Sequence, residues 1–128
     1  MIVLDASAVV AILLNETGFE QLTARLIADS DRCISPMSLV EAVMALARRY
    51  TDPMPAIDAF MQRYQVVLST VDSVQANLAV KAFLTYGKGR HPARLNLGDC
   101  FTYAAAKALN APLLYIGRDF SHTDIVAA

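Results

Sequence analysis

The first ten residues of the chain, MIVLDASAVV (1–10), decide the fold class. Residues 2–4 form a short apolar run that is rich in β-branched side chains, which predicts a buried strand. Residues 6–14 then predict a helix, so Asp5 lies at the turn between the two elements. Ligands of open α/β sheets bind at the carboxyl ends of strands, but aspartate is also a favoured helix N-cap. Both roles stay open for Asp5 on this stretch alone.

The same alternation of short apolar runs and longer amphipathic runs continues to the end of the chain. Strands alternate with helices, and no tight hairpin joins two strands, so the order favours a parallel sheet with helices on both faces. We therefore predict an α/β fold with strands at 2–4, 32–35, 66–71 and 113–117, and helices at 6–14, 18–28, 36–50, 56–64, 73–86 and 99–110.

Length and composition indicate one domain, residues 1–128, with apolar surface to spare for partners. The hydrophobic fraction is 55%, yet the longest apolar run, 8–14, has 7 residues, far short of the roughly 18 that a membrane span needs. No basic residue precedes the first apolar run and Asp5 interrupts it, so a secretory signal is not expected. We expect a cytoplasmic protein that does not bind membranes.

The charge balance argues against a general duplex-binding protein. The chain has 11 Lys and Arg against 12 Asp and Glu, for a net charge of −1, so nucleic-acid binding would need a local basic patch. Cys33 and Cys100 lie in apolar stretches without a CxxC spacing. They are predicted to be buried free thiols and not metal ligands.

Four acidic residues occur in apolar surroundings where ordinary surface acids are not expected. Asp5 and Asp119 each follow a predicted strand, Asp99 begins the predicted helix at 99–110, and Glu41 lies within an apolar helix. Every residue three or four positions from Glu41 is uncharged, so its helix offers it no ion partner. A carboxylate at the helix rim, facing water, is the alternative for Glu41, and helix capping is the alternative for Asp99.

Together these four acids predict a cluster at the carboxyl edge of the sheet. Carboxylates that share a site either keep protons at neutral pH or are neutralised by cations. A ligand set of oxygen atoms alone suits Mg²⁺ or Mn²⁺. Such ions activate water and stabilise the leaving oxygen in phosphodiester hydrolysis.

Three ordered motifs give the chain a resemblance to a known family. They are MIVLDASAVVAIL (1–13), SLVEA (38–42) and LNLGDCFTYAAAKALNAPLLYIGRDFSHTDI (95–125). In this order and spacing they resemble the PIN-domain family, and specifically the VapC-type toxins of bacterial toxin–antitoxin pairs. The resemblance covers essentially the whole chain.

The resemblance implies a PIN-like parallel sheet between helices and a Mg²⁺-dependent (or Mn²⁺-dependent) endoribonuclease. It implies that Asp5, Glu41 and Asp99 bind the metal and that Asp119 completes the site. Asp124 is the poorer candidate for the last position, with a local capping or turn role expected. Ser7 could orient Asp5 or a metal-bound water, or form a hydrogen bond at the helix start. The resemblance also implies cleavage of cellular RNA (tRNA or rRNA), a homodimer, and inhibition by a small VapB-like antitoxin.

A basic loop, YGKGRHPAR (86–94), precedes the third motif. It carries Lys88, Arg90 and Arg94, which are 3 of the 11 basic residues of the chain. With Arg118 they are predicted to contact RNA phosphates without reading the base sequence. A solvated loop without a binding role is the alternative.

Three rival functions fit parts of the pattern. A phosphatase with an aspartyl nucleophile would want a second acid at the position of Ser7, which argues against that class. A receiver-like module that binds one cation would not cleave RNA. A PIN-type nuclease of ordinary RNA maturation would lack an antitoxin, and the neighbouring gene would separate it from a toxin.

Overall fold

The computed structural model describes all 128 residues, and its centre is a four-stranded parallel sheet. The strands lie in the order β3-β2-β1-β4, so the chain begins in the middle of the sheet. In the register, Val3 of β1 lies opposite Cys33 of β2 and Leu113 of β4. The parallel α/β fold predicted from the sequence is confirmed. The strands are β1 (Ile2–Leu4), β2 (Arg32–Ile34), β3 (Val66–Leu68) and β4 (Leu113–Leu114).

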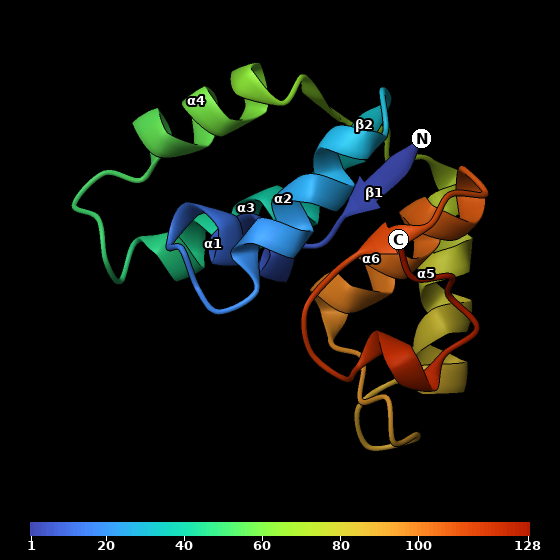
Figure 1. The fold of residues 1–128 in the computed structure, drawn as a ribbon. Helices are drawn as coiled ribbons and strands as arrows, with labels where there is room; N and C mark the ends of the chain where they lie inside the picture. The colour runs from blue at the N-terminus through green and yellow to red at the C-terminus, as the bar shows by residue number, and fades with distance from the viewer.

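Helices cover both faces of this sheet (Figure 1). The helices α1 to α4 pack on one face and α5 and α6 on the other, as the two buried apolar clusters show. In Figure 1, α4 lies at the outer edge of the first group. The helices are α1 (Ala6–Leu13), α2 (Phe19–Ala28), α3 (Pro36–Leu46), α4 (Met54–Arg63), α5 (Ser73–Tyr86) and α6 (Leu97–Ala108), followed by the 3₁₀ helix η1 (Phe120–His122).

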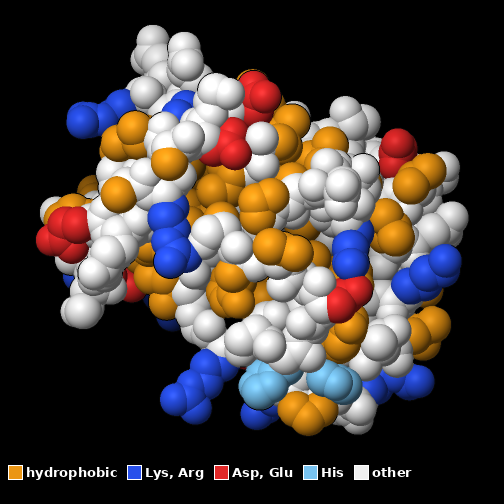
Figure 2. Space-filling model, turned by 45° about the vertical axis from the view of Figure 1, so that its right-hand side comes forward, with side chains coloured by type: hydrophobic (Ala, Val, Ile, Leu, Met, Phe, Trp, Pro, Cys, Tyr) orange, Lys and Arg blue, Asp and Glu red, His pale blue; other side chains and the backbone are white.

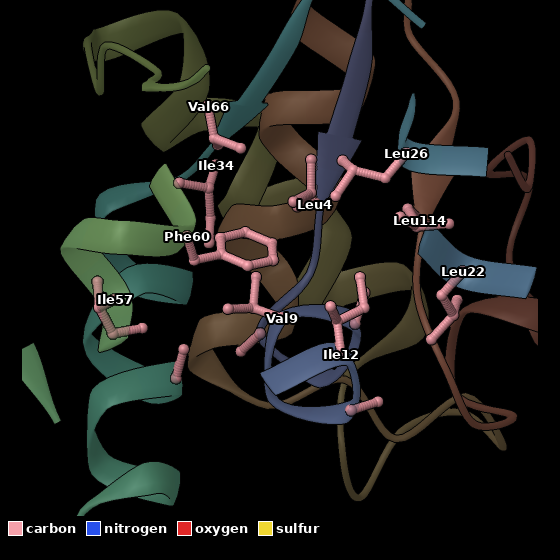
Figure 3. Close-up of a cluster of buried hydrophobic side chains, with 14 of the residues drawn as sticks. Leu4, Val9, Ile12, Leu22, Leu26, Ile34, Ile57, Phe60, Val66 and Leu114 are labelled. Carbon is pink, nitrogen blue, oxygen red and sulfur yellow. The ribbon is translucent and has the colours of Figure 1, made fainter. Parts of the chain in front are cut away.

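The alternation of side chains along β1 divides the core into two clusters, because successive residues of a strand point to opposite faces. Leu4 packs in the cluster under α1 to α4, whereas Val3 packs in the cluster under α5 and α6. Figure 3 shows the first cluster, to which α4 contributes Ile57 and Phe60; the Phe60 ring points toward Leu4 and Val9. These two anchors, both at most 3% exposed, hold α4 to the domain.

Several predicted boundaries are wrong. The helix predicted at 36–50 ends at Leu46, which is fully buried, whereas residues 47–50 are exposed. Helical stability comes mainly from burying an apolar face, so the helix stops where burial stops. The second, third and fourth strands are shorter than expected, and α6 begins two residues before Asp99 with Asn96 as its N-cap.

None of the helices combines the length and the apolar character that a membrane span needs.

The fold brings the predicted acids to the carboxyl edge of the sheet. There the residue after β1, the second turn of α3, the first turn of α6 and the segment after β4 supply the predicted acids.

Candidate active site

Asp99 lies within electrostatic range of the other three predicted acids. The negative charges of Asp5, Glu41 and Asp119 all raise the pKa of Asp99, and Asp5 also raises the pKa of Glu41. The structure has two ion pairs, the N-terminal amino group with Asp29 and Lys107 with Asp124. Neither involves these four carboxylates, so the cluster has no cationic side chain to neutralise it.

Asp5 caps α1 and also belongs to the cluster, so the two roles considered for it are compatible. Its Oδ2 accepts hydrogen bonds from the Ser7 backbone N–H at 3.0 Å and from Ser7 Oγ at 2.6 Å. Its Oδ1 accepts one from Thr102 Oγ1 at 3.2 Å. Ser7 Oγ in turn accepts from the Ile116 N–H at 3.1 Å, so Ser7 ties the end of β1 to the segment after β4. Only 6% of Asp5 is exposed, which fixes the carboxylate rather than leaving it mobile.

Asp99 lies at the third position of α6 and is not its N-cap, which corrects the capping alternative. Asn96 is the N-cap, and the two residues form a reciprocal capping box with distances of 2.8 and 3.1 Å. Only Oδ2 of Asp99 takes part, which leaves Oδ1 for a ligand. Burial raises the pKa of Asp99 to about 7; the Asn96 N–H opposes this shift and the neighbouring acids add to it. Asp99 therefore exchanges its proton near neutral pH.

Glu41 points at α6 rather than away from the domain. A Cβ placed on Gly98 would lie 1.6 Å from Glu41 Oε1, so the carboxylate occupies the space that a side chain at position 98 would need. Burial, and then the charge of Asp5, raise the pKa of Glu41. The water-facing rim position considered for Glu41 does not describe this contact. The contact with Gly98 was not predicted from the sequence, although a glycine in the first turn of a helix beside an acid is a visible signal.

The C-terminal acids differ from each other. Asp119 is exposed, lies between β4 and η1, and makes no ion pair with its neighbour Arg118. Asp124 accepts hydrogen bonds from Tyr103 Oη at 2.7 Å and from Lys107 Nζ at 2.6 Å. The Lys107 bond, with help from Tyr103, lowers the pKa of Asp124. Asp124 is thus already paired, whereas Asp119 has no ion pair and is near enough to Asp99 for its charge to raise the pKa of that residue.

The carboxylate oxygens of the four predicted acids suit a hydrated divalent cation. As placed, no three Asp, Glu, His or Cys side chains converge closely enough to bind one ion together. Mg²⁺ keeps several waters and commonly uses one or two protein carboxylates, so a tight cage of three is not required. Oxygen donors without nearby nitrogen or sulfur ligands match Mg²⁺ or Mn²⁺. The absence of a side chain at Gly98 lets the Glu41 carboxylate approach the first turn of α6, which carries Asp99.

The basic loop has a defined shape. The Lys88 N–H donates to the Leu95 carbonyl at 3.0 Å, and the Leu95 N–H donates to the Tyr86 carbonyl at 3.0 Å. The His91 Nδ1 accepts from the Ala93 N–H at 3.0 Å. These bonds hold the backbone while the side chains of Lys88, Arg90 and Arg94 stay exposed.

The loop and the C-terminal segment lie at the same end of the molecule. Figure 1 shows the loop between α5 and α6 next to η1, below the two helices. Figure 2 shows both histidines of the chain together at the lower edge, with Lys and Arg side chains around them. The two histidines, His91 and His122, belong to the loop and to η1 respectively. Arg118 is exposed in the segment that leads into η1.

Comparisons with known proteins show the family and the fold of the chain. The family model of the PIN domain matches residues 2–126. The chain is 44% identical to Ribonuclease VapC30 of Mycobacterium tuberculosis over 124 residues, which is 96% of this chain and 95% of that protein. It is 42% identical to Ribonuclease VapC of Mycolicibacterium smegmatis over 126 residues, which is 98% of each. In fold it is similar to the crystal structure of Mycobacterium tuberculosis VapC20, a toxin that cleaves the sarcin–ricin loop. That match has a TM-score of 0.76, 19% identity, and coverage of 100% of this chain and 98% of the other.

Proposed function

The chain belongs to the PIN-domain family, and on that premise we propose that it is a VapC-type toxin, a metal-dependent endoribonuclease of the cytoplasm. The whole of residues 1–128 acts as a single PIN domain. The observation that carries the proposal is the group of four carboxylates, none of them in an ion pair, at the carboxyl edge of the sheet. Two relatives named as ribonucleases, which match nearly the full length of the chain, support the proposal.

In this function Asp5, Glu41 and Asp99 hold Mg²⁺ or Mn²⁺, and Asp119 completes the site from the exposed side. The bound cation supplies an activated water and stabilises the leaving oxygen of the phosphodiester. The protein orients Asp5 through the bonds from Ser7 and holds Asp99 through the capping box. Asp99 would hold the cation in its ionised form, which burial disfavours by raising the pKa of Asp99 to about 7.

Glu41→Gln tests the site with a change that keeps volume and removes one charge. We expect Mn²⁺ affinity to fall by about tenfold or more and RNA cleavage to fall with it. The metal-free variant should unfold no earlier than the wild type, because a repulsive charge is lost. Calorimetric titration with Mn²⁺, thermal melts with and without the ion, and cleavage of labelled RNA measure these effects.

The matched control is Glu20→Gln, the same chemical change at an exposed position of α2. It should leave metal affinity and cleavage at wild-type values. If Glu41→Gln also binds Mn²⁺ and cuts RNA as the wild type does, Glu41 does not belong to the site.

The basic loop is proposed to hold the RNA backbone. Replacing Lys88, Arg90 and Arg94 by alanine should weaken RNA binding and lower the slope of log affinity against log salt by about 2 to 3, since each phosphate contact contributes about 0.7 to 0.9. Mn²⁺ affinity should not change, because the acids remain. Filter binding or fluorescence anisotropy over a salt series measures the slope.

A second triple variant provides the control for this experiment. Arg48, Arg49 and Lys81 are exposed on other elements, and their replacement by alanine removes the same charge. If both triple variants lose the same salt dependence, the effect is general electrostatics and the loop has no special role.

A homodimer is the assembly that we propose, with the groove between α5 and α6 as its surface. This groove of about 530 Å³ is lined almost wholly by apolar side chains, among them Phe83 and Leu84. Both side chains are exposed, at 43% and 55%. Leu84→Glu should convert a dimer into a monomer, as measured by sedimentation equilibrium. Ile27→Glu, at an equally exposed apolar residue of α2, should leave the mass unchanged; a dimer that survives Leu84→Glu would exclude this surface.

A cognate antitoxin separates a toxin from a nuclease of RNA maturation. We expect expression of the chain alone to arrest growth, and Asp5→Asn to relieve the arrest. Co-expression of a small DNA-binding protein encoded by the neighbouring gene should also relieve it. Growth that is unaffected by the wild-type chain would favour the maturation nuclease.

A further inference from the structure

Two buried hydroxyl groups connect the elements that carry the acids. Ser38 of α3 and Thr102 of α6 are both fully buried, and Ser38 Oγ lies 2.5 Å from Thr102 Oγ1. Thr102 Oγ1 lies 3.2 Å from Asp5 Oδ1. A continuous chain of three polar groups therefore runs from α3 through α6 to the residue that follows β1.

The chemistry of these groups fixes the direction of the chain. An ionised carboxylate only accepts hydrogen bonds, and a hydroxyl has one proton to donate. The Thr102 hydroxyl must therefore donate its proton to Asp5 Oδ1. In the bond between the two hydroxyls, Ser38 Oγ is then the donor and Thr102 Oγ1 the acceptor. The opposite direction would set lone pairs of Thr102 against those of Asp5 Oδ1 inside the protein.

The two hydroxyls also lie one helical turn from two of the other acids. Ser38 precedes Glu41 by three residues on α3, and Thr102 follows Asp99 by three residues on α6. Residues three apart share a helix face. The hydroxyl pair therefore joins the same faces of α3 and α6 that present the two carboxylates.

We propose that Thr102, supported by Ser38, is a positioning residue of the metal site. Its hydroxyl orients the Asp5 carboxylate and ties α3 and α6, which carry Glu41 and Asp99, to the end of β1. This inference rests on the proposed function and extends it to residues outside the acid motifs. Two apolar side chains could fill the same volume, but they would leave Asp5 Oδ1 without its donor.

Three variants at this site separate positioning from simple core packing. Thr102→Val keeps the shape and removes the hydroxyl, and Thr102→Ser restores a hydroxyl. The double variant Ser38→Ala, Thr102→Val removes both partners, so that no buried hydroxyl is left without a bond. Thr23→Val is the control, because Thr23 also makes a helix hydroxyl bond, to the Phe19 carbonyl on α2.

The measurement is Mn²⁺ affinity by calorimetry, together with the rise in melting temperature on adding Mn²⁺. We expect Thr102→Val to lower the affinity by about 10- to 100-fold and Thr102→Ser to stay within about threefold of the wild type. Relative to Thr102→Val, the double variant should regain only the metal-free stability that the unpaired Ser38 hydroxyl costs, because Asp5 Oδ1 still lacks its donor. Its Mn²⁺ affinity should not recover, which a role in packing alone would not produce.

The outcomes distinguish this inference from the proposed function. Wild-type affinity in the folded double variant would overturn the positioning role and leave the metal site standing. A wild-type protein that binds no Mn²⁺ and cuts no RNA would overturn both.

Discussion

Asp99→Asn is expected to lower RNA cleavage at saturating Mg²⁺ by at least about a hundredfold while the fold is retained. Asparagine keeps the size of the side chain and can still accept the Asn96 N–H bond of the capping box. It removes the charge that a divalent cation needs. Cleavage of labelled RNA by the purified variant, with circular dichroism as the check on folding, measures the effect. Cleavage at the wild-type rate would remove Asp99 from the site.

The same variant should change how stability depends on pH. The pKa of Asp99 is raised from 3.8 to about 7 in the folded protein, so the folded state holds the proton more tightly than the unfolded state. The free energy of unfolding of the metal-free wild type should therefore fall as the pH rises from about 4 to about 7. Asp99→Asn should show a smaller fall, since only the raised pKa of Glu41 remains, and should be more stable than the wild type at pH 8 by a few kcal/mol. An equal pH dependence in both proteins would contradict the raised pKa.

Gly98→Ala should damage the site and spare the fold. The added methyl group would overlap the carboxylate end of Glu41, a flexible group that can move away. Alanine is a better helix former than glycine, so the free energy of unfolding should rise by up to about 1 kcal/mol. The displaced Glu41 should lower Mn²⁺ affinity and cleavage by about tenfold or more. Calorimetric titration and urea denaturation measure the two effects separately.

A second variant tests whether Glu41 is the group that moves. Aspartate is one methylene shorter than glutamate, so the double variant Gly98→Ala, Glu41→Asp should lose less affinity than the two single effects combined. Independent sites show additive free energies, whereas groups in contact do not. If the losses of Mn²⁺ binding free energy in the two single variants add up to the loss in the double variant, the Glu41 carboxylate does not lie against residue 98.

The spacing of apolar residues along the chain was enough to predict most helices and strands and the parallel sheet. The strand at 2–4, the helix at 73–86 and the parallel arrangement of the sheet are confirmed. The C-terminal end of α3 could not be predicted, because the apolar periodicity of the sequence continues past Leu46 whereas the burial of the side chains does not. The start of α6 depends on a capping box whose two members are both plausible caps in the sequence.

The candidate site likewise contains residues that the sequence singles out and residues whose place depends on tertiary contacts. Glu41 stands out in the sequence because its helix supplies no ion partner, and Asp5 because it follows a strand. Gly98 and Thr102 act through contacts with residues 57 and 97 positions away, which no periodicity reveals. The difference between Asp119 and Asp124 is also tertiary, since it depends on the bonds of Asp124 to Tyr103 and Lys107.

Metal-dependent RNA cleavage is the most direct test of the account. The purified wild-type chain is incubated with labelled RNA after treatment with a chelator, and again after Mg²⁺ or Mn²⁺ is restored, beside Asp5→Asn under the same conditions. The account predicts no cleavage without metal, discrete cleavage products when metal is restored to the wild type, and none from Asp5→Asn in either condition. Cleavage that persists in the chelator, or that Asp5→Asn shares with the wild type, would contradict it.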